Sequence, residues 1–237
     1  MFLYYALGIV MIPGIIMGIW AQCKVVSTFN KYSKVQTKSG RTANEVARTM
    51  LDGGGCQDTK IQTIRGELTD NFNPQNNTVS FSQSVYGQSS VAAVGVAAHE
   101  IGHVFQHKAK YKPIQLRSAM VPIVNISNFL VWPLIIIGLI MEISFQATQA
   151  MWLIYIGLIL YSMSTIFSLI TLPVELNASK RAYKMLVSTG EMDKEEGAGV
   201  KKVLNAAAWT YIAGLVTSIL SLLRLVLYIF MLRGDRN

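Results

Sequence analysis

Four apolar runs, each about twenty residues or longer, alternate with polar stretches along the 237-residue chain. A run of that length can cross the hydrocarbon core of a bilayer as a helix. The pattern therefore predicts a mainly α, multi-pass α-helical membrane protein. Its predicted segments are an N-terminal transmembrane anchor at 1–21, a polar segment at 22–118, a transmembrane hairpin at 119–172, a polar helical segment at 173–206, and a C-terminal transmembrane helix and tail at 207–237.

Composition and charge support this prediction and also indicate on which side of the membrane the polar segments lie. Hydrophobic residues make up 51% of the chain and charged residues only 14%, a balance that excludes an ordinary soluble domain. The net charge of +8 arises mainly in the two polar segments, and loops rich in Lys and Arg stay on the cytoplasmic side of a membrane. Residues 142–149, inside the hairpin, contain no Lys or Arg and are expected outside. We therefore predict a multi-pass plasma-membrane protein whose basicity reflects topology and lipid headgroups, not nucleic-acid binding.

The segment 22–118 has the pattern of a small α+β domain. A capping box at Thr42 and Glu45 predicts a helix through Leu51. Strands are predicted near 60–68 and at 78–82, after a turn at Asn73 and Pro74. The second strand could align an extended substrate by backbone pairing, as an edge strand does, or be purely structural. A further helix is predicted from Ser89 or Ser90 to Lys112, with Pro113 ending it.

That last helix carries His-Glu-Ile-Gly-His at 99–103. His99 and His103 lie one turn apart on one helix face, so both imidazoles can bind one zinc ion while Glu100 acts on the attacking water. With three His in the chain, chance would produce this motif in roughly one such chain in a thousand. The motif predicts a catalytic zinc site with Glu100 as general base; a structural histidine pair is the alternative.

The third zinc ligand must come from outside this helix. His107 continues the same face, but it lies about 12 Å along the axis from His99, too far to share one ion. All three His of the chain are then accounted for, so a carboxylate is expected, and topology excludes Glu142. Glu175 is favoured because Pro173 is expected to open a helix that holds it rigidly in the first turn, although Glu175 could instead stabilise that helix end by its charge. The other carboxylates on the same side are Glu191, Asp193, Glu195 and Glu196.

The chain resembles the bacterial YugP-like neutral zinc metallopeptidases over nearly its whole length. The resemblance is carried by the anchor, by residues 46–52, by His-Glu-Ile-Gly-His with Gln106, by Pro-Val-Glu-Leu-Asn-Ala-Ser at 173–179, and by Val-Leu-Asn-Ala-Ala-Ala at 203–208. That family is similar in logic to the HtpX-type membrane peptidases. The resemblance implies one zinc ion on His99, His103 and Glu175, with Glu100 as base. Where the HtpX group carries an Asp four residues after the ligand Glu, this chain has Ser179, so the roles of Ser179 and Asn177 are open.

These observations predict a membrane-embedded zinc metalloendopeptidase of the gluzincin type, with a small zincin-like cytoplasmic domain built around the motif helix. Its expected partners are the lipid bilayer and peptide or membrane-protein substrates; the oligomeric state is left open. Two other functions are possible: a noncatalytic membrane scaffold with structural zinc, and a transporter with a proton relay, although the predicted spans contain no His or carboxylate. Candidates by residue type for stabilising the oxyanion are Tyr86, Arg181, Tyr183 and Tyr211.

Overall fold

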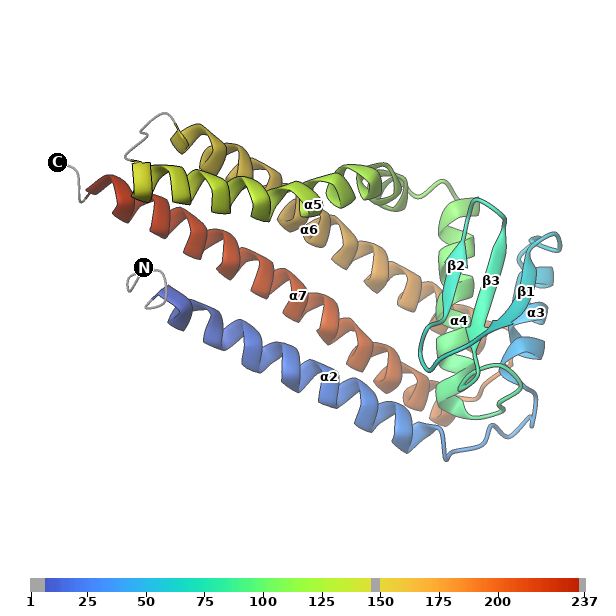
Figure 1. The fold of residues 1–237 in the computed structure, drawn as a ribbon. Coiled ribbons are helices and arrows are strands. Elements are labelled where there is room, and N and C mark those ends of the chain that lie inside the picture. Colours follow the sequence, from blue (N-terminus) through green and yellow to red (C-terminus); the bar gives the residue numbers. More distant parts are fainter. Residues whose placement is uncertain (1–6, 146–149, 235–237) are drawn as a thin grey trace. The chain divides into compact units, whose positions relative to one another are not determined.

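The computed structural model describes residues 7–145 and 150–234 and is mainly helical (Figure 1). Its contacts divide the chain into two compact units. The first unit comprises Met1–Trp20, Leu116–Leu172 and Tyr211–Asn237, and the second comprises Ala21–Gln115 and Pro173–Thr210. The elements, in chain order, are η1 (Leu7–Met11), α2 (Ile12–Tyr32), α3 (Ala43–Gly53), β1 (Lys60–Ile64), β2 (Asn71–Asn73), β3 (Thr78–Ser82), α4 (Val91–Lys108), α5 (Lys112–Phe145), α6 (Met151–Ser188) and α7 (Lys194–Gly234).

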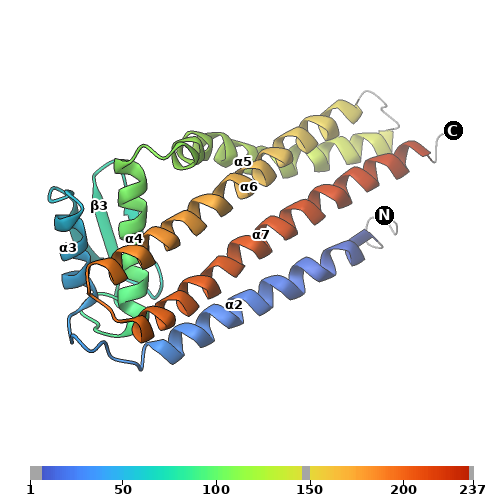
Figure 2. The same cartoon turned by 180° about the vertical axis from the view of Figure 1, so that it is seen from behind.

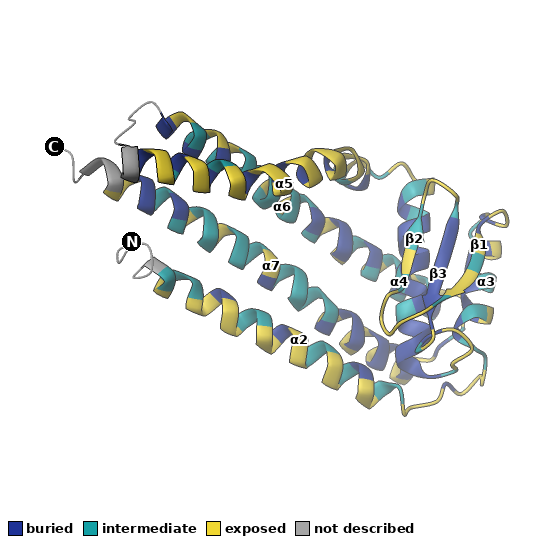
Figure 3. Cartoon of the chain, viewed as in Figure 1, coloured by how far each residue is buried: buried dark blue, intermediate teal, exposed yellow. Residues whose placement is uncertain are grey.

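Four helices of the described residues are long and apolar enough to cross a membrane, as predicted. They cover Gly8–Tyr32, Lys112–Glu142, Met151–Ser188 and Lys194–Met231. In the first unit, residues of α5, α6 and α7 form a buried apolar cluster around Ile154. Large side chains such as those of Phe129 and Trp152 remain exposed on these helices. Figure 3 shows exposed residues repeated along α5. Exposed apolar surface of this extent is what lipid-facing helices present.

The helices are longer than the predicted spans. Glu142, which was predicted to lie in an external loop, is a buried residue within α5. The predicted loop is wrong at these positions, because residues 142–145 contain no helix breaker and α5 continues through them; the external side of Glu142 stays a prediction. Residues 146–149, the rest of the predicted loop, lie outside the described residues. The predicted division into five segments stays a prediction.

The second unit contains a three-stranded sheet of order β1-β3-β2. β1 runs parallel to β3, with Lys60 opposite Thr78, and β2 runs antiparallel to it, with Phe72 opposite Val79. All five residues of β3 are buried. β3 is therefore the central strand, and the prediction that residues 78–82 could align a substrate as an edge strand is wrong, since both of its edges are already paired. β2 was not predicted because its three residues, two of them Asn, have little strand propensity.

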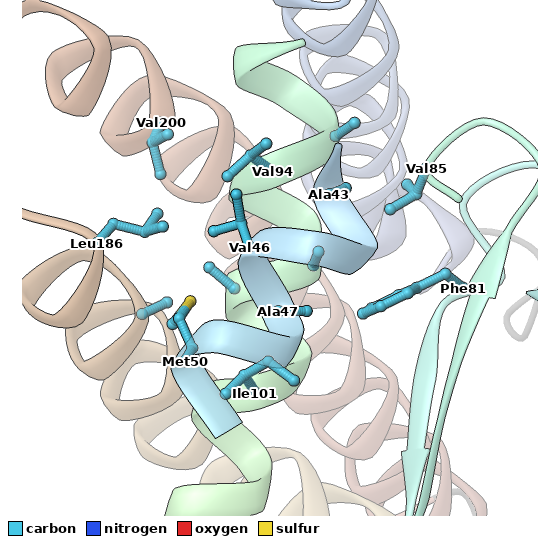
Figure 4. Close-up of a cluster of buried hydrophobic side chains, with 14 of the residues drawn as sticks. Ala43, Val46, Ala47, Met50, Phe81, Val85, Val94, Ile101, Leu186 and Val200 are labelled. Carbon is cyan, nitrogen blue, oxygen red and sulfur yellow. The ribbon is translucent and has the colours of Figure 1, made fainter. Parts of the chain in front are cut away.

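The core of the second unit lies between α3, α4 and the sheet. Val46 and Met50 of α3 face Ile101 of α4, and Phe81 extends from β3 toward them (Figure 4). Leu186 of α6 closes the same buried cluster. The predicted start of α3 is confirmed, because the backbone N–H of Thr42 donates to the Glu45 carboxylate at 2.8 Å. This core holds α4 along its length.

Helix α4 begins where it was predicted and ends four residues earlier. The Ser90 hydroxyl accepts a hydrogen bond from the Ala93 N–H at 3.2 Å, so Ser90 is its N-cap. The helix ends at Lys108, and Lys110 adopts a left-handed backbone conformation. Pro113 lies in the first turn of α5 and does not end α4. Proline suits a first turn because its missing N–H would have no helical partner there.

Candidate metal centre

His99 and His103 lie one turn apart on α4 and point toward the same place. Their ring centroids are 4.8 Å apart, and the ring planes are nearly perpendicular. His103 is buried, and the side chain of His99 is 14% exposed. The i, i+4 spacing in the sequence thus produces two imidazoles around one point, as predicted.

Glu175 of α6 meets these two histidines. Its Oε2 atom lies 3.2 Å from Nε2 of His99 and 3.4 Å from Nε2 of His103, and the carboxylate is buried. The reason given for favouring Glu175 is wrong, however. Pro173 does not open a helix but lies inside the continuous helix α6, so Glu175 is in the middle of a helix and cannot act through the charge of a helix end.

The other predicted candidates lie elsewhere in the second unit. Glu191 pairs with Arg41, and Asp193 pairs with Lys38. The Glu196 carboxylate accepts from the backbone N–H of Asp193. His107 packs its ring against the edge of Phe72, 5.4 Å away between centroids. Among the described residues, the group with the spacing of a metal site consists of His99, His103 and Glu175, whose ligand atoms all lie within 4.8 Å of one another.

The spacing of these atoms suits three ligands of one zinc ion. Two ligands about 2.0–2.1 Å from one tetrahedral zinc lie roughly 3.3 Å from each other, close to the 3.2 and 3.4 Å between the imidazole nitrogens and Glu175. Without an ion, the 3.2 Å contact between His99 and Glu175 is within hydrogen-bond distance. Two imidazole nitrogens and a carboxylate oxygen are also a donor set that zinc takes in proteins.

The close approach of α4 and α6 depends on Gly102. A Cβ atom added to Gly102 would lie 2.5 Å from the carbonyl oxygen of Ala178, which is below any tolerated contact. Ala178 is itself buried, so neither backbone has room to retreat. The glycine between the two histidines therefore lets α6 come near enough for Glu175 to reach them. Figure 2 shows the last part of α6 crossing α4.

A buried hydrogen-bond network orients His103. Its Nδ1 atom lies 3.0 Å from Oε1 of Gln106, which has no exposed surface. The Gln106 amide nitrogen donates to the Val174 carbonyl at 2.8 Å and to Oδ1 of Asn177 at 3.0 Å. Because both amide hydrogens are used, Oε1 must accept, and Nδ1 of His103 must be the donor. This leaves Nε2, which faces Glu175, as the nitrogen that can bind a metal ion when the imidazole is neutral.

His99 is oriented more simply, by one hydroxyl. Its Nδ1 atom lies 3.1 Å from Oγ of Ser179. Ser179 is the position at which the HtpX group has Asp. The sequence left the roles of Ser179 and Asn177 open. In the structure, Ser179 contacts His99 directly, and Asn177 is linked to His103 through Gln106.

Sequence reasoning missed Gln106 as part of the site. The available signal was its position three residues after His103, which places both side chains on one face of α4. Of the four candidates for stabilising an oxyanion, Arg181 joins the network, since its Nε donates to Asn177 Oδ1 at 2.8 Å. Tyr86 is 40% exposed, and Tyr211 belongs to the first unit.

The electrostatic environment raises the pKa values of two of these side chains. Burial raises the pKa of Glu100; the two imidazoles oppose this shift, and the negative charges of Glu175 and Asp70 add to it. Burial alone would lower the pKa of His103, but its hydrogen bond with Glu175 and the charge of Glu100 outweigh burial, so the pKa is raised. A bound cation would favour the deprotonated form of both groups.

Comparison with known proteins agrees with this geometry. Residues 7–230 match the model of a family described as "Putative neutral zinc metallopeptidase". The chain belongs to this family. It is also similar to "Putative membrane protease YugP" of Bacillus subtilis (strain 168), with 44% identity over 221 residues that cover 93% of this chain and 95% of that protein. No solved structure matches. The predicted family resemblance is confirmed, and zinc is the metal that the family implies.

Proposed function

We propose that this protein is a membrane zinc metalloendopeptidase of the gluzincin type, with His99, His103 and Glu175 as ligands of one zinc ion and Glu100 as general base. The observation that carries the proposal is the spacing of 3.2 and 3.4 Å between the two Nε2 atoms and the Glu175 carboxylate, which suits ligands of a single tetrahedral ion. Family membership supports the same metal and the same class of reaction.

Each residue has a separate task in the proposed mechanism. When bound, zinc would acidify a water molecule and polarise the carbonyl of the scissile peptide bond. Glu100 accepts the proton of the attacking water on its carboxylate and returns it to the nitrogen of the leaving amine. The raised pKa of Glu100 suits this transfer, because a base with a very low pKa would hold the proton too weakly to deliver it. Gln106 and Ser179 keep the two imidazoles turned toward the ion.

The number of ligands favours catalysis over a structural zinc site. Structural sites usually have four protein ligands, whereas catalytic sites have three and leave a position for water or substrate. Within the described part of the chain, the candidate group contains two His and one Glu and no fourth ligand. This argues against the noncatalytic scaffold.

The substrate class and the orientation are further parts of the proposal. Four helices could span a membrane, so membrane or membrane-associated proteins are the accessible substrates. The charge distribution favours a multi-pass plasma-membrane protein with the second unit on the cytoplasmic side.

The test compares the purified full-length protein with Glu100→Gln, which has nearly the same shape but no basic carboxylate. We expect both proteins to hold one zinc ion per chain, while cleavage of casein falls by at least a hundredfold in the variant. Zinc is measured by elemental analysis and cleavage by fluorescent-casein release, with chelator and zinc re-addition as controls. Undiminished cleavage by Glu100→Gln would overturn the assignment of the base, and stoichiometric zinc in an inactive wild type would favour the scaffold.

A further inference from the structure

A basic pocket lies in the second unit, outside the metal centre. It is a cavity of about 730 Å³ between the end of α4, the end of α3 and the last three turns of α6. That volume is in the range of pockets that hold small organic ligands. Four of its lining residues are cations, Lys108, Lys180, Arg181 and Lys184, and none is a carboxylate.

The positive charge of the pocket is not neutralised by neighbouring side chains. Among the residues that the structure describes, no carboxylate forms an ion pair with any of the four cations, although Lys38, Arg41 and Arg48 of the same unit do form such pairs. Four like charges around one cavity repel one another unless an anion lies between them. The pocket is therefore electrostatically suited to an anion.

Two of the cations are held in place. Lys108 donates to the carbonyl oxygens of Gly54 and Gly55 at 2.6 and 2.8 Å. Arg181 donates its Nε to Asn177, and its guanidinium lies over the ring of Tyr111 at 5.8 Å. A guanidinium positioned in this way retains its two terminal NH₂ groups, the fork that binds phosphate oxygens in pairs. Lys180 and Lys184 are exposed at the rim, where a charged headgroup can reach them.

The remaining lining is apolar and indicates an amphiphilic ligand. Phe105 and Met185 provide an apolar wall next to the four cations. In the sequence, Lys180, Arg181 and Lys184 follow the apolar run that ends at 172, and basic clusters that follow a membrane span attract anionic lipids. We propose that this pocket binds the phosphate headgroup of an anionic phospholipid. None of its cations belongs to the candidate metal group, and the two lysines varied below, Lys180 and Lys184, take no part in the hydrogen-bond network around His103.

The test measures lipid binding by the full-length protein in non-ionic detergent. Native mass spectrometry would record the uptake of phosphatidylglycerol and of phosphatidylcholine from an equimolar mixture. The double variant Lys180→Gln/Lys184→Gln is compared with Lys201→Gln/Lys202→Gln, an exposed pair on α7 outside the pocket that changes the net charge equally. We expect the wild type and the α7 variant to prefer phosphatidylglycerol, and the pocket variant to bind it at least about tenfold more weakly. Equal zinc content in all three proteins would show that folding is intact.

Three outcomes would overturn the proposal. Equal losses in the two double variants would mean that overall charge, not the pocket, attracts the lipid. Displacement of the lipid by inorganic phosphate at the same concentration would mean that the pocket takes free phosphate. Retention of a poly-glutamate peptide, lost in the pocket variant, together with no lipid preference would mean that the ligand is an acidic polypeptide.

Discussion

The two histidines of the candidate metal centre lie one turn apart on the same helix, yet the structure supports them in different ways. His103 is held by Gln106, a fully buried amide whose orientation is determined by the Val174 carbonyl and Asn177. His99 is held by the Ser179 hydroxyl, which can rotate and can donate or accept. One side of the site is therefore rigid, with its tautomer determined by a network, and the other side is adjustable.

The difference follows from burial. Gln106, which holds His103, has no exposed surface, so its polar atoms need partners within the protein. Ser179, which holds His99, is partly exposed, so water can take the place of its hydroxyl. For the proposed zinc ion, we infer that the His103 side would determine its position, while the His99 side would adjust to a bound substrate.

The largest effect is expected from a substitution that disturbs the surroundings of both histidines at once. Gly102→Ala places a methyl group 2.5 Å from the Ala178 carbonyl oxygen and must push α6 away from α4. We expect the loss of most bound zinc and of nearly all casein cleavage, with a destabilisation of about 1–3 kcal/mol. Elemental analysis, the cleavage assay and thermal unfolding would measure these changes.

Gly214→Ala is the matched control for this substitution. Gly214 also lies within a helix, but nothing is within 4 Å of the position its Cβ would take. An alanine there should keep zinc and activity and leave stability unchanged or slightly higher. Full zinc binding by Gly102→Ala would contradict the view that the helix approach assembles the site.

The second-largest effect is expected from changing Gln106, which holds only His103. In Gln106→Leu, Nδ1 of His103 has no acceptor, and the Val174 carbonyl and Asn177 lose their donor. We expect zinc affinity to fall by about 10–100-fold, measured by competition with a chromophoric chelator. Gln106→Glu should be impaired as well, because its carboxylate would face two acceptors, the Val174 carbonyl and Asn177 Oδ1. Unchanged affinity in both variants would remove the proposed role of the network.

This network also marks the limit of what the sequence can predict. The motif on α4 and the apolar helices follow from local periodicity, which a single sequence displays directly. The contact between Gln106 and Asn177 joins residues 71 positions apart, and only the packing of α6 on α4 creates it. Glu175 was selected by residue type and topology, and the structure brings it to the histidines, but the helix break expected at Pro173 does not occur. A proline removes one hydrogen bond, and the long helix around it is not ended by that loss.

A smaller effect on zinc affinity is expected from changing Ser179, which holds His99. Ser179→Ala removes the hydroxyl from Nδ1 of His99, and water can reach the partly exposed ring in its place. We expect zinc affinity to fall only a few-fold, clearly less than in Gln106→Leu. The same chelator competition, with both variants measured side by side, would decide the order. A larger loss in Ser179→Ala than in Gln106→Leu would reverse the comparison of the two sides.

The smallest effect concerns the pH dependence of stability on the rigid side. In the metal-free protein the pKa of His103 is raised above its ordinary value of 6.5, because the hydrogen bond with Glu175 and the charge of Glu100 outweigh burial. A raised pKa in the folded state means that the protonated imidazole stabilises the fold. This contribution is fully present below about pH 6.5 and is lost as the pH rises through the folded-state pKa. Zinc binds only the neutral imidazole, so the stabilisation by zinc changes in the opposite direction and grows with pH.

Thermal unfolding from pH 6 to 9, with and without zinc and with His103→Gln as the reference, tests this expectation. The slope of stability against pH should have opposite signs in the metal-free and the zinc-bound protein. Parallel slopes would show that His103 does not bind the metal through the atom that faces Glu175.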